Sequence, residues 1–456
     1  MTPVDNLNGS FPMVTVYVTN RNYGKYVDEC LESVYNQSFQ DFELIIVDDG
    51  STDNPNSYLE KYRHSKNTSV IFNRQQGLNA SSNQALRLAK GKYIVRVDAD
   101  DKIHRDMLKL LVDKMESDDR ISLVFPDYFL IDEAGCVFAE ERRHNFDHVS
   151  LYDQPAHGAC TLIRTDTLIE INGYSEDFSC QDGFELWIRV IEHGKVANIG
   201  VPLFFYRQHE ASLSKNKKKL LETRAEIIRR FSSNIVPSNS KHVAVIPVRN
   251  GSSSLFALES LGSQCVIDRQ IELLLSSELI TDIVLSTNSD SLIEHVSSMS
   301  YSKLIILDRR PDYLSSHHSP LELTARYICN QYFGSLETIS LLTIEHLFRR
   351  SIYIDKGIRL LYLFGADSCI AVERMTDNLY KHEGAGLIPV NASIPLRCER
   401  EFIYRGVGGL HISKARHILN EGSFIGGITT HINMDELSCM DFSSPEMLQC
   451  ARIMLA

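Results

Sequence analysis

The run at residues 91–101 constrains the fold more than any other stretch of this chain. It reads Gly-Lys-Tyr-Ile-Val-Arg-Val-Asp-Ala-Asp-Asp, so a β-prone segment ends in three carboxylates, Asp98, Asp100 and Asp101. The segment is typical of a buried strand, and open α/β sheets bind ligands at the carboxyl ends of their strands. Carboxylates this close repel one another unless a cation joins them, and hard oxygen ligands favour Mg²⁺ or Mn²⁺. The alternative is an acidic turn that binds no metal.

The segments before this run alternate between strand and helix patterns. Strands are expected at residues 14–18, 42–47 and 70–72, and helices at residues 26–36 and 84–90, with residues 77–83 as a polar stretch between. This order predicts a parallel sheet with right-handed crossovers and a nucleotide site at its edge. The second strand ends in Asp48-Asp49-Gly50-Ser51. These acids are suited to accept from an imide N–H such as that of uracil, although turn and helix-cap chemistry explains the same residues.

Composition bounds the class of protein. A chain of 456 residues is expected to hold two or three domains, and a formal net charge of −12 argues against general nucleic-acid binding. The ten cysteines include no C-x-x-C pair, so neither a zinc site nor a disulfide framework is predicted, and a reducing cytoplasm fits best. The amino terminus lacks a signal-peptide pattern, and no apolar run approaches the length of a membrane span. Peripheral contact with the inner face of the cytoplasmic membrane stays open.

The first half resembles the family 2 glycosyltransferases, which have the GT-A fold. The resemblance rests on residues 14–53, with Val-Asp-Asp-Gly-Ser at 47–51, and on residues 77–101, with the signature Asp98-Ala99-Asp100. It implies a UDP-sugar donor bound with Mn²⁺ or Mg²⁺, in which Asp49 faces the base, Asp98 the ribose and sugar, and Asp100 the metal. The residues implied to bind the nucleotide-sugar are Asn22, Asp49, Asn83, Asp98 and Arg207.

A later motif of the same family implies the general base. Residues 157–164 resemble the acceptor-side strand, and residues 173–189 resemble the segment that begins the family's Glu-Asp helix. An inverting transfer needs an ionised carboxylate within hydrogen-bond reach of the acceptor hydroxyl, and Asp182 is the candidate. Asp182 is also placed to cap that helix, with Glu185 in its first turn. The single tryptophan, Trp187, is expected to pack.

The family's closing phrase resembles residues 203–214. It implies that Arg207 stabilises the leaving phosphate and that His209 approaches the metal or diphosphate, although a structural histidine is equally compatible. Residues 215–230 then read as an amphipathic helix with a basic start. Its basic face is suited to an anionic acceptor or a lipid surface, and a solvated helix is the alternative.

A polar, Pro-containing break at residues 236–242 predicts a linker between a domain at 1–235 and a second at 243–456. The second domain begins with a strand at 243–247 and a Gly/Ser loop at 248–254, and it resembles the cytidylyltransferases that make CMP-sialic acid and CMP-Kdo. Ser253, Leu258, Asn288 and Asn433 stand where that family has lysines and acids. Because nucleotidyl transfer depends on cations that neutralise a triphosphate, we expect this domain to be catalytically degenerate. Arg249 and Asp435 remain as ligand candidates.

The predicted fold class is therefore α/β, with two Rossmann-like nucleotide-binding domains. The leading function is an inverting hexosyltransferase acting on a saccharide or lipid-linked acceptor in surface polysaccharide or capsule synthesis. One alternative is a bifunctional enzyme whose second half also activates a 3-deoxy-ulosonic acid as a CMP-sugar, and another is a non-catalytic scaffold in capsule assembly. A homo-oligomer formed through the second domain stays open.

Overall fold

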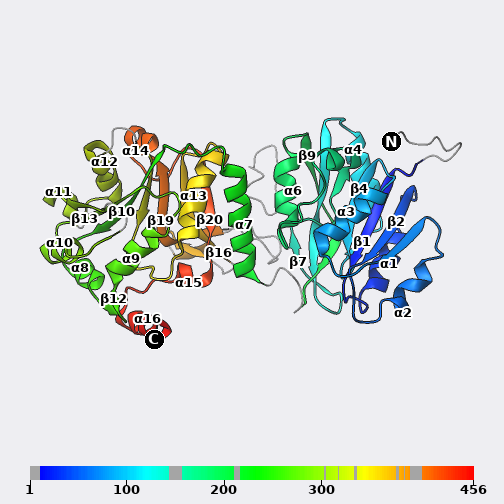
Figure 1. Cartoon of the computed structure of the whole chain (residues 1–456), viewed down its shortest axis with the longest axis horizontal. Helices are drawn as coiled ribbons and strands as arrows, with labels where there is room; N and C mark the ends of the chain where they lie inside the picture. Colours follow the sequence, from blue (N-terminus) through cyan, green and yellow to red (C-terminus); the bar gives the residue numbers. More distant parts are fainter. Residues whose placement is uncertain are drawn as a thin grey trace. The chain divides into compact units, whose positions relative to one another are not determined.

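The computed structural model describes residues 11–142, 157–209, 216–301, 305–316, 318–332, 336–375, 379–384, 386–390 and 403–455. The chain divides into two compact units, with the boundary between Asn216 and Lys217 (Figure 1). Each unit is built on its own mixed β-sheet. Within the described residues, none of the helices is both long and apolar enough to cross a membrane.

The first unit contains a nine-stranded sheet in the order β3-β2-β1-β4-β8-β6-β9-β5, with β7 paired to β6. Its strands are β1 (Val14–Asn20), β2 (Phe42–Asp48), β3 (Thr68–Phe72), β4 (Tyr93–Asp98), β5 (Lys102–Ile103), β6 (Ile121–Ile131), β7 (Val137–Glu141), β8 (Leu162–Arg164) and β9 (Lys195–Arg207). The first four strands run parallel, and β8 is antiparallel to β4. The predicted β-α-β-α-β-α-β order and parallel pairing are thus confirmed for β1–β4.

Helices cover both faces of this sheet because alternate residues of each strand point to opposite sides. The helices are α1 (Val27–Tyr35), α2 (Asn56–Leu59), η1 (Glu60–Tyr62), α3 (Leu78–Leu88), α4 (Met107–Glu116), α5 (Thr165–Glu170) and α6 (Asp182–Val190). Apolar residues of α1 and α4 pack in one buried cluster with Val14, Val16 and Val18. Those of α3, α5 and α6 pack in another with Tyr17 and Ile45.

Helix α3 begins earlier than its sequence suggests. The polar stretch at residues 77–83 was expected to be a loop, yet the helix starts at Leu78. The Asp49 carboxylate accepts hydrogen bonds from the backbone N–H groups of Gln76 and Gly77, at 2.8 and 2.9 Å. Ser81 and Ser82 are buried in the helix. A carboxylate distant in sequence therefore fixes the chain just before a segment whose own residues favour turns.

The second unit contains a seven-stranded sheet in the order β14-β13-β10-β15-β19-β16-β20. These strands are β10 (Lys241–Val248), β13 (Asp282–Thr287), β14 (Ile305–Arg309), β15 (Leu336–Leu342), β16 (Ser368–Met375), β19 (Ile403–Lys414) and β20 (Thr429–Asn433). Two small hairpins pair β11 (Ser260–Leu261) with β12 (Gln264–Cys265) and β17 (Tyr380–His382) with β18 (Leu387–Pro389). As in the first unit, four parallel strands meet an antiparallel one, because β10, β13, β14 and β15 run parallel and β19 opposes β15.

The helices of the second unit are α7 (Lys217–Ser232), α8 (Ser252–Ala257), α9 (Val266–Leu275), α10 (Asp290–Ser297), α11 (Asp312–Ser315), α12 (Leu321–Tyr332), α13 (Ser351–Leu363), α14 (Ala415–Glu421), α15 (Glu436–Cys439) and α16 (Pro445–Leu455). Helix α7 packs against α13. Its residues Ala225, Ile227 and Ile228 are buried. The stretch that we expect to be a linker, residues 236–242, therefore lies inside the second unit, between α7 and β10, and Lys241 and His242 already belong to β10.

Candidate functional site

Three loops meet at the carboxyl edge of the parallel strands in the first unit. Strands β1, β2 and β4 pair in register, so Asn20 lies beside Asp48 and Thr19 lies beside Asp98. The acids of the two sequence motifs therefore come to one edge of the sheet, as the sequence predicts. In open α/β sheets this edge is where ligands bind.

Asp100 lies against His209. Nε2 of His209 is 2.9 Å from Oδ2 of Asp100, and both side chains are at least nine-tenths buried. The imidazole also stacks on the ring of Tyr26 and meets the edge of Tyr23. Asp100 and His209 are 109 residues apart in the chain, and the fold brings them together. They are the two side chains that the family resemblance implies as metal ligands.

Arg207 has a different set of partners from the one expected of a phosphate clamp. Its Nε donates to the backbone carbonyl of Asp100 at 2.8 Å, and its Nη2 pairs with Glu29 at 2.6 Å. Nη1 donates to the carbonyls of Asp132 and Glu133, and the side chain is only 1% exposed. The guanidinium therefore fixes the backbone around the acidic motif.

Arg96 links two carboxylates that the sequence places in the site, Asp98 and Asp182. It lies in β4, 3% exposed, with Nη1 2.6 Å from Oδ2 of Asp182 and Nε 2.9 Å from Oδ1 of Asp98. Burial alone would raise the pKa of Asp182, but the charge and hydrogen bond of Arg96, together with His157, lower it below its usual value. Asp182 is therefore held in the ionised form that a general base requires.

The pKa of Asp98 is shifted in the opposite direction, upward. Burial raises its pKa to about 6, although Arg96 opposes the rise, while Asp100 and Asp182 add to it. The hydroxyl of Thr19 donates to its Oδ1. Its neighbour Asp101 accepts from the backbone N–H of Arg207 through Oδ1, while Oδ2 is buried without a hydrogen-bond partner in the structure.

Gly158 leaves room for the Arg96–Asp182 pair. A Cβ atom at this position would overlap Oδ2 of Asp182 and lie 2.7 Å from Nη2 of Arg96. The residue before it, His157, packs among the rings of Tyr128, Phe204 and Tyr206. The segment that resembles the family's acceptor-side strand thus packs directly against the candidate base, Asp182.

Helix α6 begins at Asp182 itself, so the cap position falls to Gln181, which has a left-handed backbone conformation. Asp182 still lies in the first turn, where a negative charge is favoured by the helix dipole. Glu185 pairs with Arg189 through two hydrogen bonds instead of interacting with the helix start. Trp187 packs on Phe125, with ring centroids 4.7 Å apart, which confirms its expected packing role.

On the nucleoside side, the loop after β2 is held by its own residues. Asp48 accepts from Asn20 at 2.7 Å and from the hydroxyl of Ser51 at 2.6 Å. Asn22 is exposed and accepts from the backbone N–H of Thr52 at 2.7 Å, so it joins the loops after β1 and β2. Asp49 points to the start of α3.

Asn83 lies in α3 and has partners for both of its amide groups. Nδ2 donates to the carbonyl of Tyr174 and to Glu176, and Oδ1 accepts from the N–H of Tyr174. These bonds anchor the chain that leads to α6. The Asn83 side chain therefore supports the site indirectly, through the segment that precedes α6.

The residues present fit a divalent ion that takes its remaining ligands from substrate. Asp100 and His209 offer two ligand atoms, and Mg²⁺ in particular is usually held by one or two carboxylates together with phosphates and water. Beside them, the buried Oδ2 of Asp101 has no hydrogen-bond partner in the structure, and burial together with Asp100 and Asp98 raises the pKa of this carboxyl. Within the described residues, the first unit holds no set of three such ligands close enough to enclose an ion without a substrate.

The second unit places its two ligand candidates differently. Arg249 follows β10 and donates to the carbonyl of Ser319 at 2.7 Å. Asp435 caps α15, where it accepts from the N–H of Ser438 at 3.0 Å and from the hydroxyl of Tyr353 at 2.6 Å. Asn288 accepts from the N–H of Asn250 at 2.8 Å and so holds the Gly/Ser loop.

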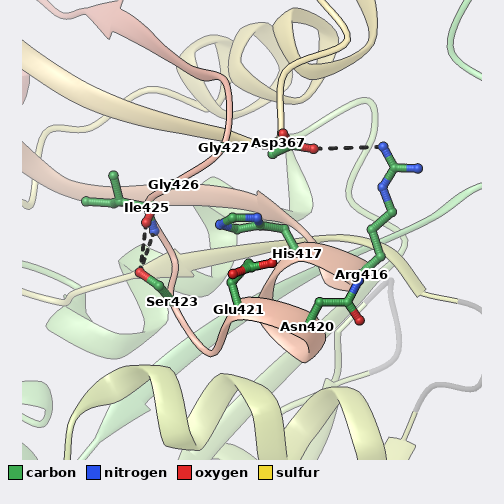
Figure 2. A pocket seen from close by; sticks show the side chains of 9 residues that line it. All are labelled: Asp367, Arg416, His417, Asn420, Glu421, Ser423, Ile425, Gly426 and Gly427. Carbon is green, nitrogen blue, oxygen red and sulfur yellow. Dashed lines mark hydrogen bonds and ion pairs between the residues drawn. The ribbon is translucent and has the colours of Figure 1, made fainter.

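A cavity of about 720 Å³ opens elsewhere in the second unit (Figure 2). Residues before β16 and β20 and from α14 line it: Asp367, Arg416, His417, Asn420, Glu421, Ser423, Ile425, Gly426 and Gly427. Because β16 and β20 run parallel to β10, this is the amino edge of the sheet, opposite to the Gly/Ser loop. The cavity is therefore not the nucleotide site that the sequence predicts.

Comparison with known proteins defines the class of the first unit. Residues 15–167 match the model of Glycosyl transferase family 2. Chondroitin synthase from Escherichia coli is 29% identical over 192 residues, which are 41% of this chain and 28% of that protein. The UDP-Glc:alpha-D-GlcNAc-diphosphoundecaprenol beta-1,3-glucosyltransferase WfaP of Escherichia coli is 24% identical over 220 residues, which are 48% of this chain and 86% of that one.

A solved structure of S. aureus TarS 1–349 in complex with UDP-GlcNAc matches with a TM-score of 0.42 and 20% identity, over 50% of this chain and 68% of that one.

The amino-terminal half of the chain contains a family 2 glycosyltransferase domain. The chain spans little more than a quarter of the length of chondroitin synthase.

Sequence reasoning missed Arg96 and Gly158. Arg96 carried a usable signal, because a charged residue inside the apolar run Tyr93-Ile94-Val95-Arg96-Val97 must find a buried partner. Gly158 carried none, since its importance comes from two side chains that lie 62 and 24 residues away in the chain.

Proposed function

We propose that the first unit is an inverting, metal-dependent hexosyltransferase that moves a sugar from a UDP-sugar to a hydroxyl of a growing surface polysaccharide or lipid-linked glycan. The contact of Arg96 with both Asp98 and Asp182 carries the proposal. Through these contacts Arg96 connects Asp98, which the resemblance implies binds the donor, with Asp182, which it implies is the general base. The match to family 2 and the similarity to chondroitin synthase support a glycosyl transfer, and the similarity to a UDP-Glc-dependent glucosyltransferase supports the donor class.

In the proposed reaction, Asp182 accepts the proton of the acceptor hydroxyl while the acceptor oxygen bonds to the anomeric carbon. The bond from that carbon to the diphosphate breaks on the opposite side, and UDP leaves with the electron pair. Arg96 holds Oδ2 of Asp182 and so orients the carboxylate. Buried general bases of this kind contribute about 10²- to 10⁴-fold in rate.

Asp100 and His209 would hold Mn²⁺ or Mg²⁺, which neutralises negative charge on the departing diphosphate when bound. Arg207 acts as a positioning residue in this proposal, because its guanidinium is bonded to the carbonyl of Asp100 and to Glu29. Asp98 binds the ribose and sugar. Asn22 and Asp49 shape the nucleoside side, and Asn83 anchors the chain before α6.

The test is a screen of UDP-sugars for release of UDP, with and without Mn²⁺. We expect at least one donor to be hydrolysed or transferred by the wild type. Asp100→Ala and Asp182→Asn should each lose about 100-fold or more in rate. Asp113→Asn is the matched control, since Asp113 is exposed on α4 and should leave the rate unchanged. Equal rates for all four proteins would favour the scaffold alternative.

For the second unit, we propose a cytidylyltransferase-like module that binds a ligand but does not make CMP-sugars. Its four parallel strands and the loop after β10 support the likeness. Asn288 bonds the loop backbone where the family has an acid, and Asp435 is engaged as a helix cap. Incubation with CTP and a 3-deoxy-ulosonic acid should release no pyrophosphate, and turnover would favour the bifunctional alternative.

A further inference from the structure

Three side chains of different chemistry converge in the second unit, and none of them is part of the sites described above. Cys265 ends β12, Asp268 lies in the first turn of α9, and His295 lies in α10. Sγ of Cys265 is 3.0 Å from Oδ2 of Asp268 and 3.4 Å from Nε2 of His295, and that Nε2 is 2.9 Å from Oδ1 of Asp268. Among the described residues, these are the three ligand-bearing side chains whose ligand atoms all lie within 4.8 Å of one another.

The geometry does not match a nucleophile activated by a histidine. In such a relay, the acid contacts the ring nitrogen that is remote from the nucleophile, so that the imidazole passes a proton between its two ends. Here both the thiol and the carboxylate approach the same nitrogen, Nε2 of His295. The three ligand atoms therefore surround one point.

Helix capping accounts for only part of this arrangement. Asp268 accepts from the backbone N–H of Cys265 at 3.1 Å, which is an ordinary bond at a helix start. The Cys265 side chain is the other member of this capping box, but the cap does not require an imidazole from another helix. Burial and the hydrogen bond to Asp268 raise the pKa of the Cys265 thiol to about 11, so the thiol is protonated in the structure as it stands.

We propose that Cys265, Asp268 and His295 bind one Zn²⁺ ion with an open fourth position. Zinc bonds to sulfur at about 2.3 Å and to imidazole nitrogen or carboxylate oxygen at about 2.0–2.2 Å, so the ligand atoms of a tetrahedral site lie about 3.3–3.5 Å apart. The Sγ–Nε2 distance of 3.4 Å already matches, and the Nε2–Oδ1 distance of 2.9 Å needs a small outward movement of Asp268, whose other oxygen, Oδ2, faces Sγ at 3.0 Å. A mixed sulfur, nitrogen and oxygen set selects zinc over Mg²⁺ or Mn²⁺.

Loading is balanced by the release of one proton. Zinc displaces the thiol proton of Cys265, and the neutral imidazole of His295 carries its proton on Nδ1 so that Nε2 can bind the metal. The side chain of His295 is 32% exposed, which gives the ion a path from solvent and leaves room for a water as the fourth ligand. The hydroxyl of Tyr301 is buried without a well-aligned hydrogen bond, and Asp268 and Cys265 add to the effect of burial in raising its pKa to about 12.

The experiment titrates the metal-free full-length chain with Co²⁺, a spectroscopic substitute for Zn²⁺, in excess Mg²⁺. The Mg²⁺ occupies oxygen-ligand sites such as that of Asp100 but does not bind thiolates. We expect a thiolate-to-cobalt charge-transfer band that saturates at one equivalent and disappears when Zn²⁺ is added. Zinc should also raise the unfolding temperature of the wild type, because it binds only the folded state.

Cys265→Ser keeps a hydrogen-bond donor to Asp268 and should fold, yet it should lose the band and bind zinc about 100-fold or more weakly. His295→Gln should also weaken binding. Cys329→Ser, at another buried cysteine of the same unit, is the matched control and should keep the band. The proposal is overturned if the wild type shows no band, or if the band survives in Cys265→Ser. His295→Gln at wild-type zinc affinity would overturn the three-ligand site.

Discussion

At the scale of single residues, the buried guanidinium of Arg96 decides the charge state of the candidate base. Asp182 would have a raised pKa from burial alone, and Arg96 and His157 bring it below the usual carboxyl value. A base whose pKa is lowered stays ionised as the solution becomes more acidic. The chain therefore keeps Asp182 competent over a wide pH range through one ion pair.

Replacing Arg96 by methionine should move the acid limb of the pH–rate profile to higher pH. Without the guanidinium, burial is the dominant influence on Asp182, so its pKa rises and the base protonates earlier as pH falls. The measurement is the pH dependence of kcat/KM for UDP release. Arg87→Met, at an exposed arginine on α3, should keep the wild-type profile. An unshifted acid limb in Arg96→Met would contradict this role.

Gly158→Ala should lower kcat while leaving UDP affinity unchanged. The new Cβ would displace Oδ2 of Asp182 and Nη2 of Arg96. A misplacement of about 1 Å costs on the order of 100-fold in rate. The comparison is with Gly406→Ala, where a Cβ meets nothing within 4 Å. Full activity in Gly158→Ala would mean that Asp182 does not perform the chemistry.

The sequence was informative about residues that belong to strand-end motifs. The sequence predicted one site for Asp98, Asp100, Asp182 and His209. In the structure Asp100 contacts His209. Asp98 and Asp182 both contact Arg96. The sequence could not reveal that the partners of Arg207 are backbone carbonyls and Glu29, because those contacts depend on the path of distant loops. A search for paired cysteines also could not reveal the cluster of Cys265, Asp268 and His295, because its members come from three separate elements.

At the scale of elements, the start of α3 depends on a carboxylate from another strand. Asp49 accepts from the N–H groups of Gln76 and Gly77, so the same residue that is implied to face the base also fixes the chain just before α3. This dual use explains why the helix start was predicted several residues too late. The local residues, Asn79, Ser81 and Ser82, do not favour a helix on their own.

Asp49→Ala should destabilise the first unit by about 1 kcal/mol or more, because the backbone N–H groups of Gln76 and Gly77 lose their acceptors. Asp49→Asn keeps one acceptor oxygen and should lose less stability. If Asp49 also contacts the base, both variants should bind UDP more weakly than the wild type. Urea unfolding and titration with UDP separate the two roles. Asp53→Ala, at an exposed aspartate of the same loop, tests whether the loop alone is responsible.

At the scale of the whole molecule, each unit repeats four parallel strands followed by an antiparallel one. The alternation of strand and helix patterns predicted the start of both sheets. The boundary was harder to place, since α7 looks like a surface helix in sequence and its apolar residues, including Ile227 and Ile228, find partners only in the folded second unit.

The second unit should lose stability as pH falls below 6.5. Burial, together with the nearby charge of Arg359, lowers the pKa of His242 from 6.5 to about 4. The unfolded chain therefore binds a proton in this window that the folded chain does not, which costs up to about 3 kcal/mol by about pH 4. Thermal unfolding of the full chain across this range should show the loss, and His242→Asn should flatten it. A His242→Asn profile as steep as that of the wild type would assign the loss to other groups.

The most direct test of the central claim is calorimetric titration of the full chain with UDP, in the presence and absence of Mn²⁺. We predict binding with Mn²⁺ that weakens about tenfold or more when the metal is removed or when Asp100 is replaced by alanine. UDP affinity that is the same in all three conditions, or no binding with Mn²⁺ to a folded protein, would contradict a metal and nucleotide site at the carboxyl edge of the first sheet.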